Sequence, residues 1–215
     1  MEESNRCGDH SFQAIACRYP IAWVRTGVNL HVVSKRIAKF VTAMKDLSID
    51  EIKNWRAFED LVADYFREAQ RIPDTHVESV EIKQTGTGPD GGRDILVKLK
   101  VNDAIERFER KWVVQCKFLD RNVGKADLAD VNIPTLVHEH GADGYLLVCK
   151  HHLTAQLADA FERLSENCRF GYQYVFWNQN SLLSRIRSHD RLISHYFPEH
   201  YRHLVEQRMK GGLIQ

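Results

Sequence analysis

The chain lacks a long hydrophobic run, a surplus of one charge and a secretion signal. No stretch approaches the roughly 18 consecutive apolar residues of a membrane-spanning helix, and the polar residues 1–6 contain no signal-peptide core. The chain has 30 lysine and arginine residues against 29 aspartate and glutamate residues, so any surface that binds a polyanion must be local. Without internal repeats or low-complexity tracts, the sequence is that of an ordinary globular protein.

Cysteine usage argues against disulfides and structural zinc. Five cysteines are present, an odd number, and no two of them form a CxxC pair. Cys116 and Cys149 fall in apolar runs typical of strands, and we interpret them as buried, reduced thiols of a cytoplasmic protein. The histidines at 138–140 and 151–152 lack partners at a metal-binding spacing such as HExxH, so we interpret them as surface or loop residues.

The length of 215 residues and the 43% hydrophobic content suit one domain with a small appendage. We predict three parts. Residues 1–48 form an N-terminal helical extension packed on the core, including an amphipathic helix at 32–44. Residues 49–190 form the main domain, and residues 191–215 form a C-terminal tail or linker.

Hydrophobic periodicity predicts the order helix, three-strand meander, helix, strand, helix, strand, helix. The clearest helix begins at a capping box, Ser48 to Glu51, and ends before Pro73. Strands are predicted at 77–83, 94–100, 112–118, 145–149 and 172–177, and further helices at 128–137, 153–164 and 180–186. In these helices Pro134 starts a new turn or kinks the chain, and Asn180 is an N-cap. This pattern predicts an α/β fold with a central mixed β-sheet flanked by α-helices.

The most informative motif is a glycine-rich turn, residues 86–93, that delivers Asp94 to the start of a strand. On the next predicted strand, Gln115 and Lys117 place an amide oxygen and an ammonium group on one face. If the two strands pair antiparallel, all three side chains project from the same face. Mg²⁺ prefers hard oxygen ligands and keeps several waters, so this set suits phosphodiester hydrolysis.

Two further oxygen donors complete the predicted ligand set. Gln115 is neutral, so the site has one carboxylate fewer than a glutamate would give. Glu59 restores it, because it lies at the border of the apolar face of its helix, where a side chain can reach over a sheet. The backbone carbonyl of Cys116 is another candidate ligand.

Glu59, the run Gly88-Pro89-Asp90-Gly91-Gly92-Arg93-Asp94, and Gln115-Cys116-Lys117 together resemble the PD-(D/E)xK nuclease superfamily. They most resemble its Mrr-like restriction endonuclease branch, in which glutamine commonly replaces the acidic residue. The resemblance implies a restriction-endonuclease-like fold for residues 49–190. It also implies a DNA endonuclease that depends on Mg²⁺, for which Mn²⁺ can substitute.

Residue by residue, the resemblance assigns metal binding to Asp94 and Gln115, activation of water or phosphate to Lys117, and a supporting acidic role to Glu59. We expect Asp90 to serve turn geometry. Phosphate contacts are predicted, in addition, at Lys111 and Lys125.

The implied partners are DNA and a fused or separate sensor or NTPase module, as in bacterial antiphage defence; no membrane is implied. Cleavage of both DNA strands would favour a homodimer or higher oligomer. Two other functions stay open from the sequence. One is an inactive nuclease fold that binds DNA or a partner, which the neutral Gln115 would favour. The other is a nuclease that selects branched DNA or RNA.

Overall fold

The computed structural model describes residues 46–72, 75–85, 92–103 and 105–212. The helix predicted at 32–44 and most of the extension predicted at 1–48 lie outside the described residues. So do residues 86–91 of the glycine-rich turn, including Asp90. Within the described residues, no helix combines the length and the apolar character needed to cross a membrane.

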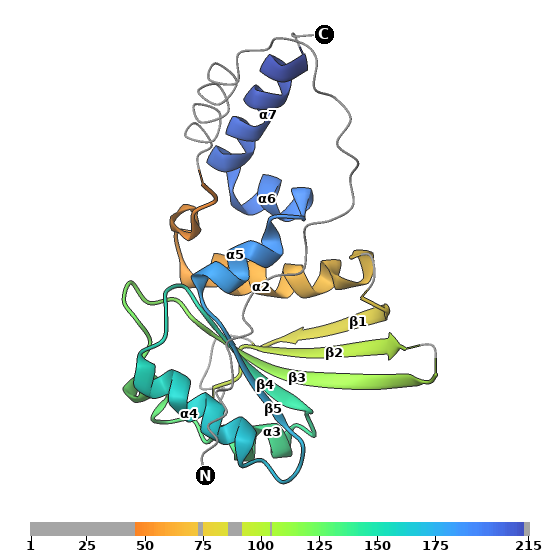
Figure 1. Ribbon diagram of the computed structural model, residues 1–215, viewed down its shortest axis with the longest axis vertical. Helices are drawn as coiled ribbons and strands as arrows, with labels where there is room; N and C mark the ends of the chain where they lie inside the picture. The colour runs from red at the N-terminus through yellow and green to blue at the C-terminus, as the bar shows by residue number, and fades with distance from the viewer. Residues whose placement is uncertain (1–45, 73–74, 86–91, 104, 213–215) are drawn as a thin grey trace, which may run out of the picture. The chain divides into compact units, whose positions relative to one another are not determined.

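Five strands form one mixed sheet in the order β1-β2-β3-β4-β5 (Figure 1). The first three pair antiparallel, whereas β3, β4 and β5 run parallel. Parallel neighbours need crossover connections, and these connections carry helices. The strands are β1 Val77–Gln84, β2 Ile95–Asn102, β3 Arg107–Lys117, β4 Gly144–Cys149 and β5 Gln173–Trp177.

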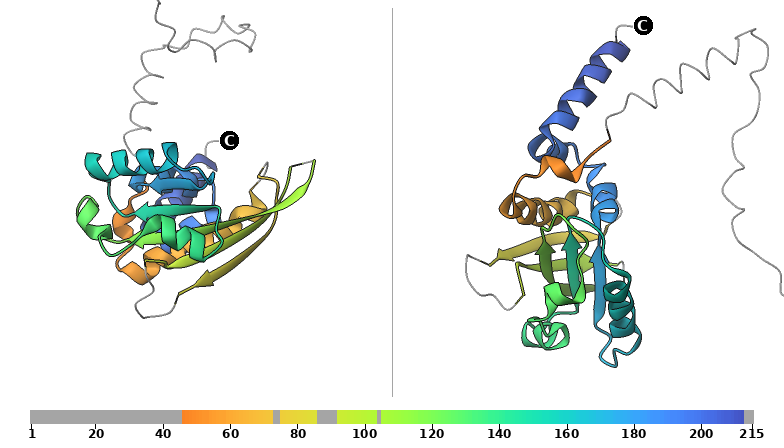
Figure 2. Two further views of the ribbon diagram at one scale, coloured as in Figure 1. Left: turned by 90° about the horizontal axis from the view of Figure 1, so that it is seen from below. Right: turned by 90° about the vertical axis from the view of Figure 1, so that its left-hand side faces the viewer.

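Helices cover both faces of this sheet, as Figures 1 and 2 show. On one face lie α2 (Trp55–Glu68) and α5 (Gln179–Ile186), with α6 (Asp190–Tyr196) packed against α2. On the other face lie α3 (Ile133–Glu139) and α4 (Ala155–Glu166). Helix α7 (Pro198–Gly212) follows α6, and short 3₁₀ turns occur at η1 Ile49–Glu51, η2 Ala69–Arg71 and η3 Lys125–Leu128. The predicted α/β sandwich is confirmed.

The alternation of side chains divides the core into two clusters. On the α2 face of the sheet, Ile95, Val114 and Val148 are fully buried with Phe58 and its helical neighbours. On the α3 and α4 face, Tyr145 and Leu147 are among the fully buried residues. All six residues of β4 are buried because β4 is covered on both faces, as expected for a parallel strand.

Two predicted helix starts are wrong. Ser48 caps only the short turn η1, where its hydroxyl accepts the Asp50 N–H at 3.2 Å. Helix α2 begins at Trp55, where the Asn54 side chain accepts the Ala57 N–H at 2.9 Å. Similarly, Asn178 rather than Asn180 caps α5. In each case the sequence offers two capping residues within six positions, and periodicity alone does not choose between them.

The chain continues as helix beyond the last helix that periodicity predicted. Leu192, Ile193 and Phe197 in and after α6 are at most 3% exposed and join the core against α2 and α5. Pro134 lies in the first turn of α3, so it begins a new helix and does not kink a longer one.

Candidate active site

Asp94 is held at the start of β2 by bonds from both neighbouring strands. Its N–H donates to the Val114 carbonyl on β3 at 3.0 Å, and its carbonyl accepts the Thr85 N–H at 2.8 Å. The Thr85 hydroxyl also donates to the Arg93 carbonyl at 2.7 Å. The residue that follows the glycine-rich turn is therefore placed by backbone hydrogen bonds, not by its own side chain.

The Asp94 side chain reaches across to β3. In the β2–β3 register Ile95 pairs with Val114. One carboxylate oxygen of Asp94, Oδ2, accepts the Cys116 N–H at 2.5 Å. Asp94 thus binds β3 at the two residues that flank Gln115, at Val114 through its backbone and at Cys116 through its side chain.

Two carboxylates from different elements act electrostatically on the Cys116 thiol. Burial raises the pKa of its thiol well above the usual value, and the negative charges of Asp94 and Glu59 raise it further. Glu59 belongs to α2, whereas Asp94 precedes β2, so both charges act at this end of β3. The charge of Glu59 thus acts on Cys116, and its supporting role in the site stays a prediction.

The alternation of peptide groups directs the Cys116 carbonyl toward β2. The Val114 carbonyl accepts from Asp94 on the β2 side, and the Lys117 carbonyl accepts the Lys150 N–H at 3.0 Å on the β4 side. Carbonyls two residues apart on a strand point the same way. The Cys116 carbonyl therefore lies on the same side of β3 as the Asp94 carboxylate.

Lys117 lies at the last position of β3, on the Gln115 face. Its positive charge lowers the pKa of Cys149 on β4, and it adds a smaller effect to the hydrogen bonds from Arg121 and the Gly124 N–H that lower the pKa of Asp127 in η3. For Cys149 burial outweighs this effect and raises the thiol pKa to about 12. Lys117 thus stands at the carboxyl end of the parallel strands, where functional groups gather in open α/β sheets.

The two predicted phosphate contacts fall in different places. Lys125 is exposed on η3, the same turn that carries Asp127, and so lies on the side of Lys117. Lys111 lies six residues before Lys117 on β3, roughly 20 Å away along the strand. Its ammonium donates to the His140 carbonyl at 3.2 Å, so it does not join the group around Asp94.

The sequence reasoning missed two buried polar residues beside the motif. The Tyr145 hydroxyl on β4 donates to Oε1 of Gln115, whose residue exposure is 4%. Lys150 follows β4; its ammonium binds Asp120 and lies 4.6 Å from the centre of the Phe118 ring. The signal for Tyr145 was its hydroxyl, since a buried tyrosine needs a partner. A lysine directly after an apolar strand was the signal for Lys150.

The donor set fits Mg²⁺ better than a transition metal. The Asp94 carboxylate and the Cys116 carbonyl are hard oxygen donors on one side of β3, and Glu59 adds a second carboxylate at the same end. Within the described ranges, no three His, Cys, Asp or Glu side chains gather as a closed metal cage would need. One or two carboxylates with retained waters are what Mg²⁺ uses.

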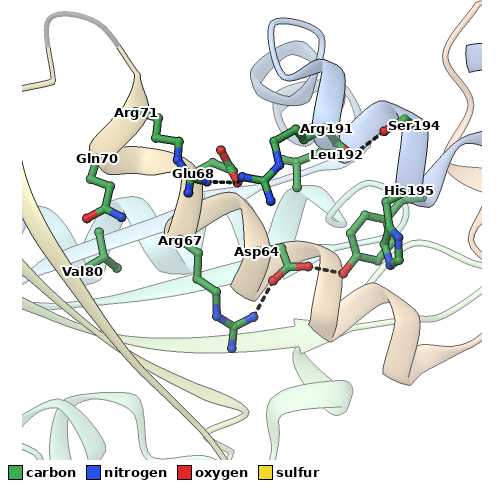
Figure 3. A pocket seen from close by; sticks show the side chains of 11 residues that line it. Asp64, Arg67, Glu68, Gln70, Arg71, Val80, Arg191, Leu192, Ser194 and His195 are labelled. Carbon is green, nitrogen blue, oxygen red and sulfur yellow. Dashed lines mark hydrogen bonds and ion pairs between the residues drawn. The ribbon is translucent and has the colours of Figure 1, made fainter.

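A cavity of about 630 Å³ lies elsewhere, between the C-terminal half of α2 and α6 (Figure 3). Its charges compensate one another. Arg71 and Arg191 both bind Glu68, at 2.5 and 3.1 Å. Asp64 accepts from Arg67 at 2.5 Å and from the Tyr196 hydroxyl at 2.6 Å. No predicted site residue lines this cavity, and we interpret its ion pairs as a brace between the helices.

Comparisons with known proteins show to which family the chain belongs. A family model described as a restriction endonuclease, Mrr_cat, matches residues 49–182. The chain is similar to the solved structure "MspJI Restriction Endonuclease in Complex with 27-mer Oligonucleotide", with 16% identity and a TM-score of 0.45 over 76% of this chain and 32% of that one. It is also similar to "DNA modification-dependent restriction endonuclease AspBHI", with 12% identity and a TM-score of 0.41 over 77% and 43%. The chain thus spans less than half of either structure. A comparison with curated proteins found no match.

Proposed function

We propose that this chain, which belongs to the Mrr-type restriction endonuclease family, is a Mg²⁺-dependent endonuclease that hydrolyses DNA. One observation carries the proposal. Asp94, at the end of the glycine-rich turn, binds the backbone of the Gln-Cys-Lys motif directly, through the Cys116 N–H at 2.5 Å. This contact between the two halves of the sequence motif supports the proposal that they form one site.

Each residue has a distinct role in this proposal. Asp94, Gln115, the Cys116 carbonyl and Glu59 are the candidate oxygen ligands of the cation. Bound Mg²⁺ would stabilise charge on the phosphate and on the leaving oxygen. The Lys117 ammonium orients the attacking water and neutralises charge on the scissile phosphate. Lys125, exposed on η3, contacts a neighbouring phosphate of the same strand.

The decisive assay is nicking of supercoiled plasmid in Mg²⁺ and in EDTA. Asp94→Asn removes the charge but keeps an oxygen that can accept the Cys116 N–H, so the fold is preserved. We expect this variant and Lys117→Ala to lose at least about 100-fold in rate, since each removes a charge needed in the transition state. Lys100→Ala is the matched control, because Lys100 is an exposed strand lysine toward the far end of β2. Mn²⁺ should restore wild-type cleavage after EDTA treatment.

The outcomes separate the proposal from its alternatives. Equal nicking by wild type, Asp94→Asn and Lys117→Ala would refute the site. Duplex binding with strong salt dependence but no cleavage in any divalent cation would favour an inactive binding module. A panel of duplex, branched, single-stranded and RNA substrates tests the remaining alternative, a structure-selective nuclease.

We also propose a setting for the activity. Target choice is made by another domain or protein, as a sensor or NTPase module would do in an antiphage restriction system. Cutting of both strands favours a homodimer or higher oligomer, which light scattering with and without DNA tests. The described cysteines, Cys116, Cys149 and Cys168, are all free thiols, which supports a cytoplasmic setting.

A further inference from the structure

Tyr145 is a buried polar residue directly beside the candidate active site. The residue is 0% exposed, and its ring packs near Phe161 in the cluster under α3 and α4. Its hydroxyl donates to Oε1 of Gln115. A buried hydroxyl proton without an acceptor is costly, so the contact orients the amide as well as the tyrosine.

The side-chain amide of Gln115 is planar, with the oxygen Oε1 on one branch and the NH₂ group on the other. With Oε1 held at Tyr145, the NH₂ group on the other branch of the amide is directed away from it. Gln115 lies between two residues of β3 that both bind Asp94, since the Val114 carbonyl accepts the Asp94 N–H and the Cys116 N–H donates to the Asp94 carboxylate. A carboxylate on the neighbouring strand therefore lies beside the residue that carries this NH₂ group.

The pKa of Tyr145 agrees with this arrangement of Tyr145, Gln115 and Asp94. Burial raises the pKa of Tyr145 well above its usual value, and the negative charge of Asp94 raises it further. The phenol consequently stays protonated, and a donor, over the working pH range. The same effect shows that the Asp94 carboxylate lies within electrostatic reach of the Tyr145–Gln115 pair.

We propose that Tyr145 is a positioning residue that holds Gln115 so that its NH₂ group, and not its oxygen, faces Asp94. This inference rests on the proposed nuclease function and deepens it. Gln115 then acts as a hydrogen-bond donor to the Asp94 carboxylate. That carboxylate also accepts the Cys116 N–H, so donors from two consecutive residues of β3 orient it. The metal-ligand role that the family resemblance assigned to Gln115 passes to Asp94, the Cys116 carbonyl and Glu59.

The first test is a double-mutant cycle on plasmid cleavage, using Tyr145→Phe, Gln115→Met and the double variant. We expect Tyr145→Phe to lower kcat by about 5- to 10-fold, the effect of one hydrogen bond, with KM for DNA unchanged. In the Gln115→Met background the same change should have less than about a twofold effect, because the hydroxyl acts through the amide. Tyr174→Phe is the matched control: Tyr174 is the register partner of Tyr145 on β5 and is 7% exposed. Additive losses, or an equal loss in Tyr174→Phe, would overturn the proposal.

The second test needs no cleavage. In metal-free, ¹⁵N-labelled protein, the Gln115 side-chain NH₂ signals are assigned by their disappearance in Gln115→Met. We expect Asp94→Asn to shift them, because a charged acceptor becomes a neutral one. If Asp94→Asn leaves the NH₂ signals unshifted and they show nuclear Overhauser contacts to the Tyr145 ring, the NH₂ group lies at the tyrosine. That result would refute the proposed orientation of the Gln115 amide. If wild type never cleaves DNA, the proposed function fails while this measurement still decides the role of Tyr145.

Discussion

Substitution of Gly92 by alanine should destabilise the fold for two separable reasons. Gly92 has φ +92°, a conformation that residues with a side chain rarely adopt, at a cost of about 1–2 kcal/mol. A Cβ atom there would also lie 2.4 Å from Cγ2 of Val131, and overpacking of this kind costs about 1–3 kcal/mol. We therefore expect a total loss of about 2–5 kcal/mol in the free energy of unfolding, measured by urea denaturation.

A control and a second variant separate the two causes. Gly171 has φ +71° but no heavy atom within 4 Å of a built Cβ, so Gly171→Ala should cost only the conformational part, about 1–2 kcal/mol. Val131→Ala in the Gly92→Ala background should recover about 1–3 kcal/mol relative to additivity, because it removes the colliding methyl groups. If Gly92→Ala costs no more than Gly171→Ala, or if the cycle is additive, the steric part of this reasoning is wrong.

Three further predictions concern acid stability, helix packing and thiol reactivity. Hydrogen bonds from Arg121 and from the Gly124 N–H hold the pKa of Asp127 at about 2. The stabilising effect of this carboxylate is therefore complete above about pH 4 and is lost as the pH falls toward 2. Between pH 5 and pH 2.5 the Tm of Asp127→Asn should fall less than that of wild type, and parallel curves of Tm against pH would contradict this. Tyr196→Phe removes the hydroxyl that donates to Asp64 at 2.6 Å between α6 and α2. The free energy of unfolding, measured in urea, should fall by about 1 kcal/mol. An unchanged free energy would mean that this contact does not stabilise the packing of the two helices. Cys149 is fully buried, and the pKa of its thiol is raised to about 12. After iodoacetamide treatment at pH 8, mass spectrometry should find Cys149 unmodified in native protein and alkylated in urea. Rapid alkylation of the native protein would refute its burial.

Periodicity was sufficient for the order of the elements in the main domain. A strand such as β4, buried on both faces, appears as a continuous apolar run, and α2 shows an apolar face because one side of it meets the sheet. It was less reliable at helix starts. Asn54 and Asn178 are the observed caps, whereas periodicity also allowed Ser48 and Asn180, which have similar capping ability.

In the candidate site, too, local sequence patterns predicted some features and only the tertiary structure decided others. Residue types and spacing were enough to select Asp94, Gln115, Lys117 and Glu59, because hydrolysis of a phosphodiester needs hard oxygen donors and a cation. Antiparallel pairing of β2 with β3 was a condition of that hypothesis, and the register shows it is met. The bond from the Cys116 N–H to Asp94 depends on one backbone position in that register, which composition and spacing do not specify.

The sequence by itself determined the fold class and the family, because both follow from local patterns: apolar periodicity, a glycine-rich turn and a short polar motif on a strand. Only the tertiary structure decided that Tyr145 meets Gln115, and that Lys111 is held at the His140 carbonyl away from the site. These contacts join residues about 30 positions apart in the sequence. They arise from the parallel pairing of β3 with β4 and from the loop before β4, which bring groups together by distance in space and not by spacing along the chain.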